Sequence, residues 1–130
     1  MVGSLSRLSV LGIIEKITLF MDVTYVNPEE SSGLLWDYPD LSEKISILSS
    51  NSNGETSQLF NDKKHSFFTY SLLKGLSGNA DDGDNIIDLG EVTEYVYKSV
   101  PENIRNQPGS LRQNPKFNGL DLKRILLDLR

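Results

Sequence analysis

The stretch ITLFMDVTYVN at residues 17–27 decides how the chain is interpreted, because it has the pattern of a buried strand that ends in a carboxylate. Its first five residues are apolar or β-branched, and Asp22 then precedes a loop that begins near Asn27. Such near-continuous apolar character predicts burial on both faces of the strand, as in a parallel sheet. Ligands commonly bind beyond the carboxyl ends of parallel strands, so Asp22 is a candidate site residue.

A second strand and a helix are expected after a polar loop at residues 27–43. The strand is predicted at residues 44–50 (KISILSS), and turn residues follow it. From Ser66 the apolar residues recur at helical spacing, and Gly78 is placed to cap the end of that helix. The side chains predicted on its buried face are Phe68, Leu72, Leu73 and Leu76.

A second helix is predicted from Asp88, at the end of the acidic stretch ADDGDNIID. Asp88 and Glu91 have the spacing of a capping box, in which each residue bonds the backbone of the other. Pro101 is expected to disturb or end this helix, because proline has no N–H to donate. The side chains predicted to form its buried stripe are Leu89, Val92, Val96 and Val100.

The remaining segments complete an α/β pattern. Residues 4–14 have helical periodicity, and residues 106–119 read as a loop with a short extended piece around Phe117. Residues 120–130 suit an amphipathic helix, but residues 125–127 also suit a strand. Strands joined by long crossovers are typically parallel, so a small parallel sheet is expected. Such a sheet would leave an apolar edge bare, which indicates that the chain forms part of a larger sheet.

Composition narrows the classes of function. The chain has 130 residues with 38% hydrophobic content, which suits one domain, and its net charge of −5 argues against a nucleic-acid-binding face. It has no cysteine, which excludes disulfides, zinc–thiolate sites and a cysteine nucleophile, and its single histidine excludes a His-rich metal site. No apolar run approaches the roughly 20 residues of a membrane span, and no clear signal-peptide cleavage site is present. A cytoplasmic protein is expected, and residues 1–4 have the character of an expression remnant.

Four segments together resemble the second, small-subunit half of caspase-like cysteine peptidases, in particular the bacterial branch near the metacaspases. They are ITLFMDVTYVN, ISILSSNSNGETSQ, HSFFTYSLLKGLSGNADDGDNIIDLGEVTEYV and QNPKF, and they span residues 17–117. The HSFFTYSLLKGL and LGEVTEYV pieces, in this order, are the specific part. The resemblance implies an incomplete half of a three-layer α/β/α domain with a small, mostly parallel sheet.

Thr24 departs from the family at the position of its nucleophilic cysteine, because Asp22-Val23-Thr24 aligns with Asp-Ala-Cys. A thiol can ionise near ambient pH, whereas a threonine hydroxyl needs a strong adjacent base. His65 resembles a structural histidine of the family, and the family's catalytic histidine belongs to the first half of its domain. No catalytic residue is therefore predicted in this chain.

The resemblance implies a non-catalytic, pseudo-peptidase domain that acts through binding. Its expected partner is a caspase-like large-subunit half or a second copy of itself, and a peptide ligand is also consistent; neither nucleic acid nor membrane is expected. The alternative is a subunit of a cysteine endopeptidase, in which Asp22 contributes an acidic pocket for Arg or Lys substrates. The competing structural interpretation is that Asp22 is a strand-terminal carboxylate hydrogen-bonded to loop amides.

A weaker alternative is a calcium-responsive binding module; otherwise no cofactor is expected. An EF-hand loop has oxygen ligands at positions 1, 3 and 5, glycine at 6 and a bidentate glutamate at 12. With Glu91 at position 12, Asp82 and Asp84 fall at 3 and 5, but Ala80 and Asn85 fall at 1 and 6. Carboxylates at these positions also suit a turn that precedes a helix N-terminus, with no metal present.

Overall fold

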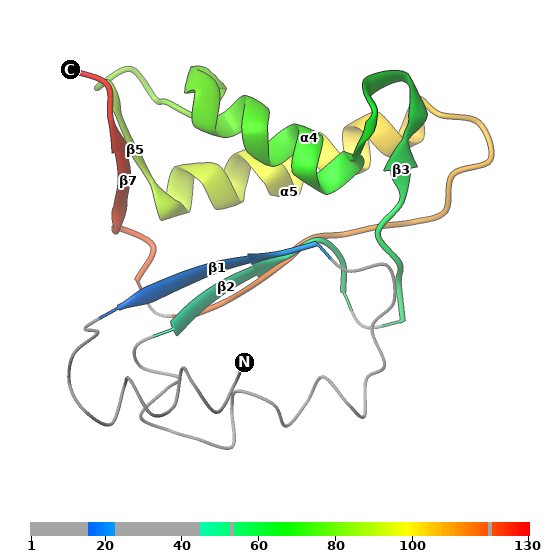
Figure 1. The fold of residues 1–130 in the computed structure, drawn as a ribbon, viewed down its shortest axis with the longest axis horizontal. Helices are drawn as coiled ribbons and strands as arrows, with labels where there is room; N and C mark the ends of the chain where they lie inside the picture. The colour runs from blue at the N-terminus through cyan, green and yellow to red at the C-terminus, as the bar shows by residue number, and fades with distance from the viewer. Residues whose placement is uncertain (1–15, 23–44, 53, 120) are drawn as a thin grey trace.

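Two helices lie over one face of a small sheet in the computed structural model, which describes residues 16–22, 45–52, 54–119 and 121–130 (Figure 1). The helices are α4 (Phe67–Lys74) and α5 (Leu89–Arg105), and they run in opposite directions. The chain is therefore α/β, as its element pattern predicted. The three-layer arrangement implied by the caspase-like resemblance stays a prediction.

The sheet contains β1 (Ile17–Met21), β2 (Ile45–Ser49) and β6 (Lys116–Asn118), in the order β1-β2-β6. β1 is parallel to β2, with Ile17 opposite Ile45, which confirms the predicted parallel pairing. β6 is antiparallel to β2, so the expectation of a parallel third strand was wrong. The reason is that two antiparallel helices separate β2 from β6. The second helix, α5, returns the chain to the end of the sheet where β2 finishes, so β6 starts there and runs the opposite way.

The central strand is buried and the edge strand is not. Residues 45–48 of β2 are buried, whereas all five residues of β1 are only partly buried. Burial on both faces was predicted for β1 from its apolar run, but the strand that is buried in this way is β2. The reason is topological, because β1 has a strand on one side only within the described residues.

Alternation along the strands divides their apolar side chains between the two faces of the sheet. On one face, Ile45 and Ile47 pack with side chains of β1. On the other face, Leu48 joins the core under the helices. That core consists of Leu48, Phe60, Phe67, Phe68, Ile87, Val92, Val96, Val100 and Ile104.

Ser66 starts α4, because its hydroxyl accepts a hydrogen bond from the Thr69 backbone N–H at 2.9 Å. The helix continues into a π-helical turn, η2 (Gly75–Asn79), in which Gly78 interrupts the helical run with a φ of 128°. Glycine suits this position because it has no Cβ to clash in that conformation. Leu73, which was expected on the buried face, is 51% exposed. Phe68 is buried as predicted, together with Phe67 and Ser71, and the predicted Leu72 and Leu76 are partly buried against the core.

The predicted capping box of α5 is confirmed. The Asp88 carboxylate accepts from the Glu91 N–H at 2.8 Å, and the Glu91 carboxylate accepts from the Asp88 N–H at 3.1 Å. The whole predicted apolar stripe of this helix is buried. Pro101 does not end the helix, which continues to Arg105. Burial of Ile104 one turn later holds this last turn against the core and offsets the hydrogen bond that proline cannot make.

Two short ribbons complete the structure. β3 (Leu59–Phe60) and β4 (His65–Ser66) pair across the 3-10 turn η1 (Asn61–Lys63). β5 (Ile86–Asp88) pairs with β7 (Ile125–Asp128), which settles the C-terminal segment as a strand.

Several sequence predictions lie outside the described residues: the helix at 4–14, the loop at 27–43 and Thr24. Within the described part of the chain, neither helix has the length and apolar composition that crossing a bilayer requires.

Candidate functional site

Asp22 lies directly after β1 and accepts hydrogen bonds from three hydroxyl groups. Ser57 donates at 2.5 Å and Thr69 at 2.6 Å, and the Ser66 hydroxyl donates to the same oxygen as Thr69. These donors come from the loop after β2, from β4 and from the first turn of α4. Asp22 thus joins the end of the sheet to the N-terminal end of α4.

The position of Asp22 suits a negative charge. Ser66 both donates to Asp22 and accepts from the Thr69 N–H, so the carboxylate lies beside the cap of α4. The N-terminus of a helix carries a partial positive charge, which favours a nearby anion. Asp22 itself is exposed, and no ion pair in the described ranges includes it. Its carboxylate is therefore held in place without being neutralised.

Among the described residues, the hydrogen-bond donors to Asp22 are three side-chain hydroxyls, not the loop amides of the competing prediction. The loop that directly follows Asp22 lies outside the described residues. His65, which resembles a structural histidine of the family, is an exposed residue of β4 that pairs with Phe60 in the ladder.

A buried glutamine fixes the loop that carries Ser57. Gln113 is only 1% exposed; its side chain accepts from the Gln58 N–H at 3.0 Å and donates to the Ser50 carbonyl at 2.8 Å. The Gln58 side chain in turn bonds both the N–H and the C=O of Leu111, at 2.8 and 2.5 Å. These residues could not be identified from the sequence, because side-chain bonds between distant segments leave no periodic signal.

Glu55 also connects the loop after β2 to the segment that contains Gln113 and Asn114. Its carboxylate accepts from the backbone N–H groups of Ser52 at 3.0 Å and Asn114 at 2.7 Å, and from the Asn114 side chain at 3.0 Å. Burial alone raises the pKa of Glu55, but the Asn114 and Ser52 hydrogen bonds and the charge of Arg112 together hold that pKa below its usual 4.5. We refer to Glu55, Gln58, Gln113 and Asn114 as the polar clasp.

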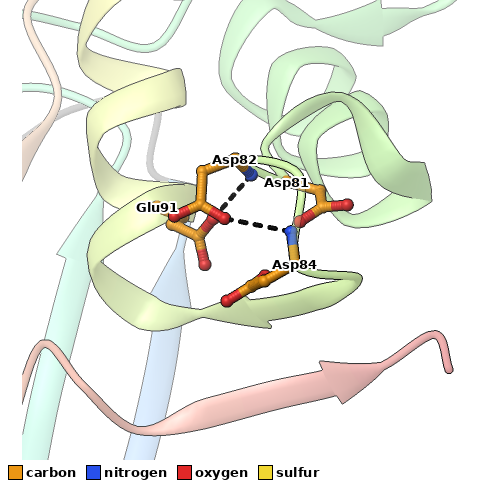
Figure 2. A group of neighbouring side chains, drawn as sticks. All are labelled: Asp81, Asp82, Asp84 and Glu91. Carbon is orange, nitrogen blue, oxygen red and sulfur yellow. Dashed lines mark hydrogen bonds between the residues drawn. The ribbon is translucent and has the colours of Figure 1, made fainter.

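The predicted metal ligands do lie together. Figure 2 shows Asp82, Asp84 and Glu91 around one turn, with Asp81, which the EF-hand register had omitted. One carboxylate oxygen from each of the four lies within 4.8 Å of the others. Asn85, at the position where an EF-hand has glycine, adopts the left-handed conformation that this position requires, with a φ of 62°.

Hydrogen bonds within the protein already engage this acidic loop. Both Glu91 oxygens accept backbone N–H groups, one from Asp88 in the capping box and one from Asp82 at 2.8 Å. Asp81 and Asp84 likewise accept backbone N–H groups of the loop, as an ordinary turn of this composition would. Each Glu91 oxygen accepts one N–H and keeps a second lone pair, so these bonds neither require nor prevent a cation, and calcium binding stays a prediction.

Comparison with known proteins gives no independent assignment. No protein-family model matches the chain, and no curated protein sequence matches it either. The caspase-like resemblance therefore stays a prediction from its motifs.

Proposed function

We propose that this chain is a non-catalytic caspase-like domain that acts by binding, with Asp22 as the acceptor for a basic side chain of a peptide or partner chain. The observation that supports this most directly is the exposed Asp22 carboxylate, which three hydroxyl donors hold and which has no ion pair with the part of the chain that the structure describes. Because hydroxyl groups orient the carboxylate without cancelling its charge, it remains able to bind an Arg or Lys from outside.

Binding without catalysis follows from the residue types available. The chain contains no cysteine, and threonine stands at position 24, where the family has its nucleophile. The hydroxyls around Asp22 are engaged as donors to its carboxylate, and a hydroxyl group needs a strong adjacent base to act as a nucleophile. Recognition is therefore the chemistry that remains.

Association with another caspase-like chain is the second part of this proposal. Within the described ranges β1 pairs with β2 alone, although its residues are mostly apolar. A strand edge of this kind offers backbone groups to a strand of another chain. We assign the outer edge of β1 to that contact, which would place the partner beside Asp22.

Peptide binding tests the role of Asp22. A labelled peptide with one central arginine should bind more tightly than the same peptide with glutamine, by roughly three- to tenfold for a partly exposed ion pair. Asp22→Asn should remove this difference. Asp62→Asn, which deletes an exposed acid of η1, is the matched control and should preserve it. Equal binding of the two peptides to the unmodified chain would refute the proposal.

The enzyme-subunit alternative keeps the same acidic pocket and adds a reaction. It predicts that Thr24→Cys, mixed with a caspase-like first-half chain that supplies a histidine, cleaves peptides after Arg or Lys. If the mixture binds the Arg peptide but does not cleave it, the enzyme-subunit alternative is refuted and binding is the function that remains.

A further inference from the structure

Hydrogen bonds from the protein occupy most of the acceptor capacity of Asp22. Ser57 donates to its Oδ1 at 2.5 Å, whereas Ser66 and Thr69 both donate to its Oδ2, Thr69 at 2.6 Å. Within the part of the chain that the structure describes, these are the hydrogen bonds that Asp22 accepts. A carboxylate has about four lone-pair positions, two on each oxygen, so Oδ2 is filled and the open position lies on Oδ1.

The hydroxyl oxygens beside Asp22 can still accept hydrogen bonds. A hydroxyl group has one proton and two lone pairs, and Ser57 and Thr69 have each donated that proton to Asp22. Neither oxygen receives a hydrogen bond from the described residues. Each lies within 2.6 Å of a carboxylate oxygen. An incoming cation would therefore meet one charged acceptor, with a neutral acceptor next to each oxygen of the carboxylate.

This set of acceptors suits the two basic side chains differently. The guanidinium of arginine binds a carboxylate most strongly through two parallel N–H donors, one to each oxygen. The filled Oδ2 of Asp22 leaves no position for the second of those bonds. The ammonium of lysine is a compact charge with three rotatable donors. It can therefore donate once to Oδ1 and turn its other donors toward the hydroxyl oxygens or water.

We propose that the Asp22 site prefers lysine to arginine, because Ser66 and Thr69 fill the carboxylate oxygen that a bidentate guanidinium would need. This inference rests on the binding function proposed above and adds which basic side chain is bound. Thr69 is the specificity-determining residue that substitution can test, since Ser66 also caps α4. Asp22 supplies the charge for either cation, and its hydroxyl donors set the choice between them.

Three labelled peptides that differ only in their central residue test this preference, by fluorescence anisotropy with the full chain. The central residues are lysine, arginine and glutamine. The lysine peptide should bind about threefold more tightly than the arginine peptide, since the energy of a whole exposed ion pair is itself small. The glutamine peptide should bind most weakly. This comparison uses the unmodified chain, so it does not depend on the folding of any variant.

Thr69→Val removes one of the two donors to Oδ2 and keeps the shape of the side chain. A guanidinium can then reach both carboxylate oxygens, so the arginine peptide should bind at least as tightly as the lysine peptide. Thr93→Val is the matched control, because the Thr93 hydroxyl on α5 is buried and has no hydrogen-bond partner in the described structure. This control should keep the lysine preference. Circular dichroism melts would establish that both variants are folded.

The possible outcomes separate the lysine preference from the binding function on which it rests. If the arginine peptide binds the unmodified chain as tightly as the lysine peptide or more tightly, and the glutamine peptide binds less, the preference is overturned and Asp22 remains a binding residue. Equal binding of all three peptides would overturn the binding function as well. A lysine preference that survives Thr69→Val would overturn the explanation through the filled oxygen.

Discussion

Substitution of Glu55 by glutamine should weaken the polar clasp in a way that depends on pH. The Glu55 carboxylate accepts the backbone N–H groups of Ser52 and Asn114, and its side chain is only 15% exposed. Glutamine keeps one oxygen for these two N–H groups. It loses the negative charge, however, and it places an NH₂ group against the side-chain amide of Asn114, which now donates to Glu55 at 3.0 Å.

The expected loss follows from the number and type of these bonds. A hydrogen bond to a charged group contributes about 1.5–3 kcal/mol, against about 1 kcal/mol for a neutral one. Two backbone bonds that each lose their charge assistance should therefore reduce the free energy of unfolding by about 2 kcal/mol at neutral pH. Asn114 can rotate its amide to satisfy the new NH₂ group, so its bond adds little to this difference.

The pH dependence gives the sharper test. The pKa of Glu55 in the folded chain is below 4.5, its usual value, so the unfolded chain binds the proton first as the pH falls. The contribution of the charge is therefore complete above about pH 4.5 and is lost as the pH falls through the folded pKa. Below that range the unmodified chain and Glu55→Gln should converge in stability.

Urea denaturation at a series of pH values measures this difference directly. Glu102→Gln, at an exposed glutamate of α5, is the matched control and should change stability little at any pH. A difference between Glu55→Gln and the unmodified chain that is the same at acidic and neutral pH would refute the assigned role of the charge. No difference at neutral pH would refute the clasp itself.

Three further outcomes are expected. Asp88→Ala should reduce the free energy of unfolding by about 1 kcal/mol in urea denaturation, because α5 loses the N-cap carboxylate that accepts the Glu91 N–H. A loss no larger than that of an alanine substitution at an exposed position would contradict the capping role. Tyr97→Phe should increase self-association in sedimentation, because the Tyr97 hydroxyl now accepts the Phe117 N–H at 2.6 Å and so occupies a backbone donor of edge strand β6. If the acidic loop binds calcium, calorimetry at millimolar calcium should give heat that Asp84→Asn reduces; no heat would exclude the calcium-responsive alternative.

The sequence pattern predicted those elements that depend on interactions between residues close together in the chain. The capping box at Asp88 and the buried stripe of α5 came directly from residue spacing, and both are present. The parallel pairing of β1 with β2 followed from the long connection between them. Pro101 was expected to disturb or end α5, but the helix continues to Arg105. The hydrogen bond that a proline loses is evident from the sequence, whereas the burial of Ile104 beyond it depends on the tertiary core.

The C-terminal strand shows why some segments stay ambiguous in sequence. Ile125-Leu126-Leu127 satisfies both a helical stripe and a strand run, because three consecutive apolar residues carry no period. This segment forms a strand rather than a helix because it pairs with β5, which lies 37 or more residues earlier in the chain and supplies unpaired backbone groups. β5 itself is only three residues long and is hidden at the end of an acidic loop.

The position of the candidate site could be predicted from the sequence, but the groups that surround Asp22 could not. Asp22 could be located because strand ends and carboxylates are visible in a linear sequence. Its three hydroxyl donors are 35, 44 and 47 residues away, and they reach it only because the polar clasp and the cap of α4 bring those segments together. Since serine and threonine are ordinary turn and cap residues, none of them marks a site by itself. What gives Asp22 its chemical character is the combination of a charge, an exposed position and neutral donors, and that combination exists only in the folded chain.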